Sequence, residues 1–118
     1  MFHELSVTAS DCPALKAMSL LERKWILQIL HSLGSGRVRF NALQDSIGDL
    51  NSVTLSRRLK LLEQYGIVTR EVVQNVPPWV EYELTPKGTE LMAVIAAVEV
   101  WCEKWDRFEG RIPLEAAV

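Results

Sequence analysis

The side chains of this 118-residue chain best suited to chemistry lie in the segment NSVTLSRRLKLLEQYG, residues 51–66. Small polar residues occupy its front, and Arg57, Arg58 and Lys60 follow. An arginine guanidinium can donate paired hydrogen bonds to guanine or to phosphate, and a lysine ammonium suits phosphate as a point charge. This chemistry is nucleic-acid recognition. A solvated helix surface can have the same composition, so the segment alone is compatible with both interpretations.

Helical spacing divides this segment into two faces. Leu55, Leu59 and Leu62 form the centre of an apolar stripe. The flanks of the stripe carry Ser56 on one side and Thr54 and Arg58 on the other. Recognition helices enter the major groove with their N-terminal part, where short side chains leave room for close approach. The side chains expected to point most nearly away from the core are Val53, Arg57, Lys60 and Gln64.

The elements that must position this segment follow from the hydrophobic pattern. The segment NVPPW, residues 75–79, is expected to form a hairpin tip, because prolines cannot join a strand ladder. Two short helices joined by a tight turn and followed by a hairpin predict a winged helix-turn-helix, a mainly α fold with a small antiparallel sheet (α+β). We expect helices over 13–21, 23–33, 41–47, 52–65 and 86–107, and extended segments around Val38, over 67–74 and over 80–84.

Positive charge is concentrated in the middle third of the chain. The whole chain has a net charge of −2, but residues 37–70 hold six basic and three acidic residues, a local net charge of +3. A local basic patch is the electrostatic footprint of nucleic-acid binding. The overall acidity leaves open a rival interpretation, a winged-helix protein–protein interaction module without DNA binding. The candidate contacts to double-stranded DNA are Arg39, Asn41, Asn51, Ser52, Thr54, Ser56, Arg57, Arg58, Lys60, Arg70, Asn75 and Trp79.

The last predicted helix carries apolar residues around too much of its circumference for one interface. Its surplus apolar surface needs a second partner, so we expect a symmetric homodimer built on 86–107 and 12–21. That dimer would set the two recognition helices about 34–36 Å apart, one turn of DNA. We expect one domain over 1–118, with 1–11 as an N-terminal arm. The expected interface residues are Leu15, Leu91, Val94, Ile95, Val98, Trp101 and Trp105.

Other chemistries have little support in the residues. His3 and His31 have no partners at metal-ligand spacing, and motifs such as GxSxG and HExxH are absent from the sequence. We therefore expect no enzyme activity, no metal and no cofactor. The longest apolar run, 91–102, is too short for a membrane span, and the start MFHELSVTAS lacks the pattern of a signal peptide. A cytoplasmic protein without a membrane partner is expected.

Four stretches of the sequence resemble the HxlR-type winged-helix regulators: CPAL, KWILQIL, RFNALQDSIGDLNSVTLSRRLKLLEQYGIVTRE and PPWVEYELTPKGTEL. The resemblance extends from about Cys12 to Trp101, and the ordered succession of motifs makes it specific. It implies a dimeric transcription regulator that binds pseudo-palindromic operators through the helix at 52–60 and the wing at 75–79. The sequence departs from the family at LERKW, where glycines usually precede KW. This departure affects a helix junction and no DNA-reading position.

Cys12 has two interpretations. Its thiol lies at or beside a helix N-terminus, where the helix dipole favours the thiolate, while the neighbouring Asp11 opposes it. Free cysteine is also among the most buried residue types and can simply fill a gap. The resemblance implies the other interpretation, since some relatives use such a cysteine to sense oxidants or electrophiles, which would make a small-molecule or electrophile effector a partner. A thiol-based redox enzyme is disfavoured, because Cys102 is far away in sequence.

Overall fold

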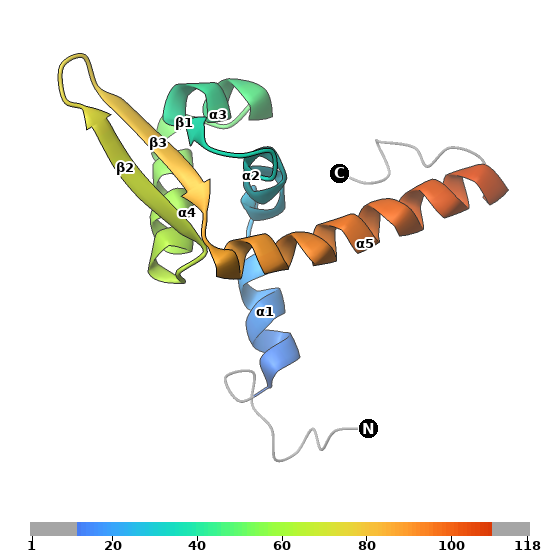
Figure 1. The fold of residues 1–118 in the computed structure, drawn as a ribbon. Coiled ribbons are helices and arrows are strands. Elements are labelled where there is room, and N and C mark those ends of the chain that lie inside the picture. Colours follow the sequence, from blue (N-terminus) through green and yellow to red (C-terminus); the bar gives the residue numbers. More distant parts are fainter. Residues whose placement is uncertain (1–11, 110–118) are drawn as a thin grey trace.

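The chain forms a winged helix-turn-helix (Figure 1) in a computed structural model that describes residues 12–109. Within that range five helices and three strands follow in the predicted order, which confirms the predicted fold class. The predicted arm at 1–11, which includes His3, lies outside the described residues. The elements are α1 (Pro13–Leu21), α2 (Ile26–Leu33), β1 (Val38–Arg39), α3 (Phe40–Ile47), α4 (Ser52–Gln64), β2 (Val68–Gln74), β3 (Trp79–Leu84) and α5 (Pro86–Glu109).

The sheet has the strand order β1-β3-β2, and both pairings are antiparallel. The pairing of β2 with β3 continues to a bulge close to the hairpin tip. The short β1 pairs with the other edge of β3, where Val38 lies opposite Tyr82 and Arg39 opposite Glu81. The sheet therefore brings residues just before α3 beside a strand that lies far along the chain.

α4 is held by the leucine stripe predicted from the sequence. Leu55, Leu59 and Leu62 are fully buried. Full burial of a leucine side chain contributes about 1.5–3 kcal/mol. Asn51 caps the helix, because its side-chain oxygen accepts the backbone N–H of Thr54 at 2.8 Å. The rest of the buried core comes from the other helices and the sheet: Leu20, Ile26, Ile29, Leu30, Leu33, Leu43, Leu50, Ile67, Val68, Tyr82 and Ile95.

The second helix begins at Ile26 and not at Arg23, as the sequence pattern predicted. Trp25 directly precedes it in a left-handed conformation with φ of +80°, which is unusual for a bulky residue. α1 ends at Leu21, so residues 22–25 form the turn between two helices. Trp25 therefore lies in this turn, half-buried against the core, and does not belong to the stripe of α2.

A tight junction connects the end of α4 to the start of α5. Gly66 has φ of +74°, the left-handed conformation that commonly follows a helix C-terminus. The Thr85 hydroxyl donates to the carbonyl oxygen of Gly66 at 2.6 Å, and the Thr85 backbone N–H donates to that of Ile67 at 2.9 Å. A Cβ atom at Gly88 would overlap the carbonyl oxygen of Ile67. The first turn of α5 therefore packs directly against the backbone just after the end of α4.

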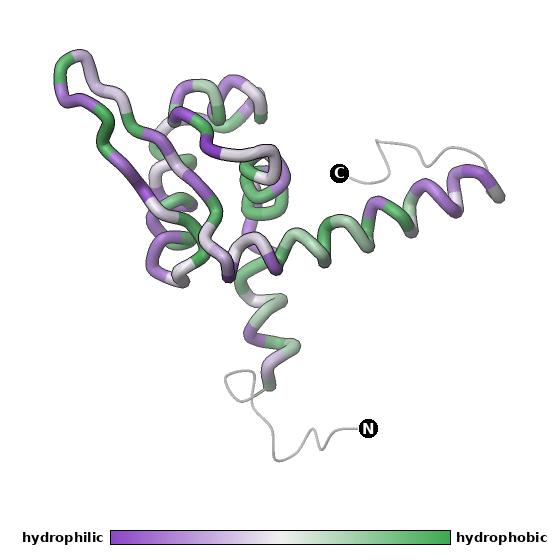
Figure 2. Tube along the Cα trace, in the orientation of Figure 1, coloured by the Kyte–Doolittle hydropathy of each residue, from purple (hydrophilic) through white to green (hydrophobic). Residues whose placement is uncertain are grey.

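α5 extends away from the rest of the chain, and its first half packs on the core (Figure 1). Apolar residues continue along α5 beyond this contact (Figure 2). Val98, Val100 and Trp101 are 59%, 66% and 58% exposed. The excess apolar surface inferred from the sequence thus faces outward in the single chain. No helix among residues 12–109 combines the length and apolarity that a membrane span requires.

Candidate nucleic-acid interface

The outer face of α4 presents two cations to solvent. Arg57 and Lys60 are exposed, and neither forms a hydrogen bond or ion pair with another residue of the range 12–109. Ser52 and Ser56 are exposed as well, while Thr54 is half-buried. The face expected to point outward does so, with small hydroxyl groups at its front. It is therefore accessible to an anionic or polar ligand.

Arg58 is engaged within the chain. Its Nε donates to the backbone carbonyl oxygen of Lys24 at 2.8 Å, and the side chain is half-buried. The sequence analysis placed Arg58 on the flank of the helix and proposed it as a DNA contact. The structure instead uses it to hold α4 against the turn that precedes α2. Its contact with DNA stays a prediction, and among the arginines of α4 only Arg57 faces fully outward.

Arg37, in the loop before β1, is held by carboxylates of the hairpin. Its Nη2 lies 2.6 Å from Glu71 Oε1, and its Nε lies 3.1 Å from Glu81 Oε1. The hydrogen bond with Glu71 is the main cause that raises the pKa of this guanidinium, and burial opposes it. The other carboxylate oxygen of Glu81 accepts the indole N–H of Trp79 at 2.9 Å. Two of the acidic side chains of the hairpin are thus compensated inside the chain.

Arg39 and Trp79, both proposed as DNA contacts, contact each other. The guanidinium carbon of Arg39 lies 4.2 Å from the centroid of the Trp79 ring, within the range of a cation–π interaction. Arg39 Nη2 also donates to the carbonyl oxygen of Pro78 at 3.1 Å. Both side chains are half-buried. They therefore attach the hairpin tip to β1, which gives them a structural role that the sequence analysis did not identify.

The hairpin tip is apolar. Gln74 Nε2 donates to the carbonyl oxygen of Pro77 at 3.1 Å and closes the turn, in which the Val76–Pro77 peptide bond is cis. Val76 is 90% exposed, and the neighbouring Asn75 is exposed as well. The sequence analysis named Asn75 and missed Val76, although NVPPW placed both at the tip. From 71 to 84 the hairpin sequence contains no lysine or arginine, so its tip offers amide and apolar contacts only.

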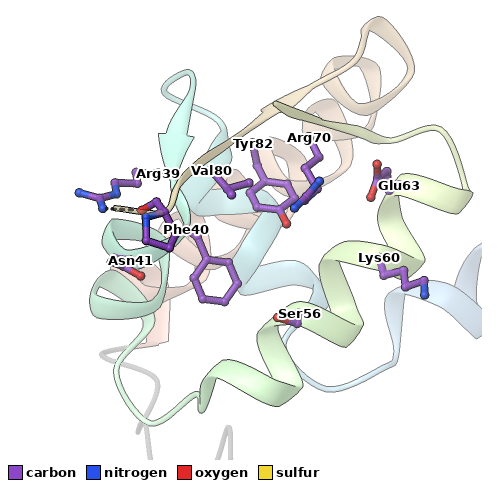
Figure 3. Close-up of a pocket in the computed structure, with 10 residues that line it drawn as sticks. Arg39, Phe40, Asn41, Ser56, Lys60, Glu63, Arg70, Val80 and Tyr82 are labelled. Carbon is purple, nitrogen blue, oxygen red and sulfur yellow. Dashed lines mark hydrogen bonds between the residues drawn. The ribbon is translucent and has the colours of Figure 1, made fainter. Parts of the chain in front are cut away.

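A groove of about 470 Å³ separates α4 from the hairpin (Figure 3). It is lined by the start of α3, one side of α4 and both hairpin strands. Glu63 of α4 also lines it and was not among the predicted residues. The structure thus gathers residues from four separate parts of the sequence around one concave surface. The predicted DNA contacts that line the groove are Arg39, Asn41, Ser56, Lys60 and Arg70.

Tyr82 is a second groove residue that the sequence analysis missed. Its side chain is only 7% exposed, and its ring lies beside that of Phe40, with the centroids 6.4 Å apart. Its hydroxyl points into the groove next to Arg70 (Figure 3). Burial raises the pKa of this hydroxyl, and a hydrogen bond with Arg70 together with its positive charge partly offsets the increase. The alternation in VEYEL indicated an inward-facing tyrosine, but it carried no signal that the hydroxyl reaches a groove.

The predicted dimer residues fall into two groups. Leu91 and Ile95 face the core of their own chain, Leu91 half-buried and Ile95 9% exposed. These two residues anchor α5, and their contact with a second copy stays a prediction. An apolar cleft of about 410 Å³ lies between α1, the end of α4 and α5. The predicted interface residues that are exposed in the single chain are Leu15, Val94, Val98, Trp101 and Trp105.

Cys12 occupies the N-cap position of α1 and is half-buried. Its thiol is free, and so is that of the half-buried Cys102 in α5. Cys12 therefore lies at the helix start expected from the sequence, neither fully buried nor fully exposed. Within residues 12–109, no group of three His, Cys, Asp or Glu side chains comes together in a way that could hold a metal ion.

The class of the protein follows from this arrangement: a helix with an open cationic face, preceded by a short helix and followed by a two-stranded hairpin, is a winged helix-turn-helix. Residues 20–109 match the family described as HxlR-like helix-turn-helix. The chain belongs to this family, which confirms the resemblance seen in the sequence. Its similar members are named as helix-turn-helix-type transcriptional regulators and not as enzymes.

Three similar proteins illustrate the relationship. The transcriptional regulator YodB of Bacillus subtilis (strain 168) is 39% identical over 95 residues, covering 80% of this chain and 85% of YodB. The structure of its reduced form has a TM-score of 0.69 at 39% identity, covering 83% of this chain and 94% of that one. Oxidised HypR, described as a redox regulator, has a TM-score of 0.71 at 32% identity (79% and 96% covered). A MarR-family regulator from Porphyromonas gingivalis W83 has a TM-score of 0.74 at 28% identity (81% and 94% covered).

Proposed function

We propose that this chain regulates transcription by binding a pseudo-palindromic operator in double-stranded DNA as a homodimer. The observation that carries the proposal is the outer face of α4, where Arg57 and Lys60 are exposed beside the groove and the hairpin. In the proposed complex α4 enters the major groove, and the hairpin tip reaches the adjacent minor groove or the backbone. Arg57 suits paired hydrogen bonds to guanine or phosphate, while Lys60 suits phosphate.

The proposal is tested by gel retardation of the DNA upstream of the chain's own gene. Arg57→Ala should weaken binding by about 1–3 kcal/mol per protomer, and added salt should weaken binding of the unaltered protein steeply. Arg23→Ala is the matched control, because Arg23 is an exposed arginine that lies in the turn before α2 and not on α4. If neither salt nor Arg57→Ala alters binding, the rival function as a protein–protein interaction module gains the support instead.

The proposed homodimer is supported by the exposed apolar side chains on α5 and α1. Val94, Val98 and Trp101 lie on α5, and Leu15 lies on α1. A symmetric contact between two copies would remove this surface from water, which is favourable by about 25 cal/mol per Å² of apolar area. Sedimentation at micromolar concentration should show a dimer, and Val98→Glu should shift it toward monomer. A monomer for the unaltered chain would contradict the proposal.

We also infer that the regulator responds to oxidants or electrophiles through Cys12. The support is the position of its thiol at the start of α1, beside the proposed interface, together with the described states of the relatives. YodB is known in a reduced and in a quinone-bound form, and HypR in an oxidised form. Alkylation by a small quinone should change the DNA affinity of the unaltered chain and of Cys102→Ser, but not that of Cys12→Ser. Equal affinities under all conditions would exclude the inference.

A further inference from the structure

We propose that the groove between α4 and the hairpin binds one phosphodiester group of the DNA backbone, with Lys60, Arg70 and the Tyr82 hydroxyl as donors. The inference rests on the proposed function and adds to it a specific contact between α4 and the hairpin. A DNA strand separates the major groove from the minor groove. If α4 lies in one groove and the hairpin tip in the other, the intervening strand must cross the space between them.

The donors come from three elements that face this space. Lys60 lies on α4, Arg70 on β2 and Tyr82 on β3, and all three line the groove (Figure 3). Lys60 and Arg70 are exposed, so their charges are accessible to a ligand. Ser56 lines the same groove one helical turn before Lys60 and adds a hydroxyl on the same side of α4. Arg39 also lines the groove but is engaged with Trp79 and Pro78, so the groove offers two further cations and two hydroxyl groups to one anion.

The groups around Tyr82 determine where its hydroxyl hydrogen points. Arg70 lies beside the Tyr82 hydroxyl in the groove, and because arginine has donors only, it can act on the tyrosine oxygen only through a lone pair. The hydroxyl hydrogen then remains available for an acceptor in the groove. Burial raises the pKa of Tyr82 above its ordinary value of 10.0, so this hydrogen is present at neutral pH. The ring is fixed by burial and by Phe40, which holds the hydroxyl in place before a ligand arrives.

Glu63 introduces an opposing charge at one end of the groove. It lies on α4 close to Arg70 (Figure 3), and its negative charge acts on Tyr82 as well. A phosphate near Glu63 would be repelled, so the favoured position is on the side of Lys60 and Ser56. The carboxylate consequently lowers the affinity for an anion and restricts where it can lie. Glu63→Gln should therefore increase DNA affinity at low salt, which is the opposite of the other groove substitutions.

The test compares substitutions on a duplex that the unaltered protein has selected from a random pool. Tyr82→Phe keeps the ring and removes only the hydroxyl, so it should reduce affinity roughly 10-fold per protomer, equally for all sequences. Because no charge changes, the slope of log K against log salt should stay the same. Arg70→Gln should reduce both the affinity and that slope, the slope by about 0.9 per protomer. Thermal melting of Tyr82→Phe checks that the fold is retained.

A phosphate scan separates a direct contact from an indirect effect of Tyr82. Each phosphate of the selected duplex is replaced in turn by an uncharged methylphosphonate. One position per half-site should lower the affinity of the unaltered protein more than that of Tyr82→Phe, in which Lys60 and Arg70 alone contact the phosphate. If every position lowers both proteins equally, Tyr82 contacts no phosphate and the inference fails. Arg57→Ala serves as the reference: if it weakens binding while the groove variants do not, the proposed function stands without this contact.

Inorganic phosphate distinguishes the DNA backbone from a free anion as the ligand. At constant ionic strength, phosphate should displace the duplex no better than chloride does, because the site is completed by the neighbouring DNA contacts. Displacement by phosphate beyond that of chloride, seen in the unaltered protein and lost in Tyr82→Phe, would identify a free-anion site and overturn the assignment to the backbone.

Discussion

The hairpin and the outer face of α4 belong to the same proposed DNA-binding unit, but they use their polar side chains in opposite ways. In the hairpin region, Arg37 pairs with carboxylates and Arg39 stacks on Trp79. On α4, Arg57 and Lys60 form no hydrogen bond or ion pair with the described part of the chain. The first region is held in place by internal contacts, and the second is open to a ligand.

This difference shows that the charge of a segment overstates the charge available for binding. Residues 37–70 carry a net charge of +3, yet Arg37, Arg39 and Arg58 are each engaged inside the chain. Substitutions in the held region should therefore lower the stability of the fold, whereas substitutions on the open face should lower DNA affinity alone.

The largest effect is expected at the junction that holds the hairpin between α4 and α5. Gly88→Ala would bring a Cβ into the carbonyl oxygen of Ile67, and backbone atoms cannot move aside as a flexible side chain can. We expect a loss of about 2–4 kcal/mol in the free energy of unfolding. Gly34→Ala is the matched control, because its closest neighbour is the mobile end of Met92. Urea denaturation measures both, and equal losses would show that the junction is not tight.

Arg39→Ala in the hairpin region and Arg57→Ala on α4 should differ in their effect on the stability of the fold. Loss of Arg39 removes its contact with Trp79 and its hydrogen bond to Pro78, so we expect about 1–2 kcal/mol less stability. Arg57 forms no hydrogen bond or ion pair within residues 12–109, so its loss should change stability by no more than about 0.5 kcal/mol. Thermal or urea unfolding of the two variants measures this difference in stability. A larger stability loss for Arg57→Ala than for Arg39→Ala would contradict the division into a hairpin region held by internal contacts and an open face of α4.

Alkaline pH should lower the stability of the fold through ionisation of the Tyr82 hydroxyl in the hairpin. Its pKa in the folded chain is raised above the unfolded value of 10.0, mainly by burial, so the fold favours the neutral hydroxyl. The resulting stabilisation is present below about pH 10 and is lost as pH rises through the folded pKa. Urea denaturation between pH 8 and pH 11 should show a loss that is smaller in Tyr82→Phe. Parallel pH profiles for the two proteins would exclude this contribution.

Arg37→Ala should have the smallest effect and a distinct salt dependence. Arg37 is exposed, so its pairing with Glu71 and Glu81 is screened by water and salt. A slight loss of stability is expected at low salt, and the difference from the unaltered chain should vanish at high salt. Arg23→Ala is the control, because Arg23 is an exposed arginine that forms no ion pair within residues 12–109. A difference that persists at high salt would indicate a packing role for Arg37.

Patterns local in sequence predicted most of the fold. The leucine spacing of α4 gave its buried and exposed faces, and NVPPW placed the hairpin tip between two strands rich in β-branched residues. Contacts between distant segments could not be predicted in this way. Arg39 meets Trp79 only because β1 pairs with β3, and the sequence pattern does not specify that register. The start of α2 was misplaced for another reason: the left-handed backbone of Trp25 contradicts the ordinary preference of a bulky residue.

The residues of the candidate site also divide into those that the sequence could predict and those that depend on contacts between distant segments. Arg57 and Lys60 could be placed by helical periodicity, which depends only on the spacing along one element. Tyr82 and Glu63 acquire their importance from the groove, which exists only when α4 and the hairpin are brought together. Ile95 is a different case. The apolar pattern of α5 marked it as a packing residue but could not distinguish the core of its own chain from a dimer interface.

The close packing at Gly88 couples the position of α5 to that of α4. Lys87 Nζ donates to the carbonyl oxygen of Tyr65 at 2.7 Å, which further ties the start of α5 to the end of α4. α5 is 24 residues long, so it extends about 36 Å at about 1.5 Å per residue. In the proposed dimer, a rotation of about 10° about the far end of such a helix displaces its start by roughly 6 Å. This exceeds the rise of one DNA base pair, about 3.4 Å, so a small change between subunits would take both α4 helices out of register with their half-sites.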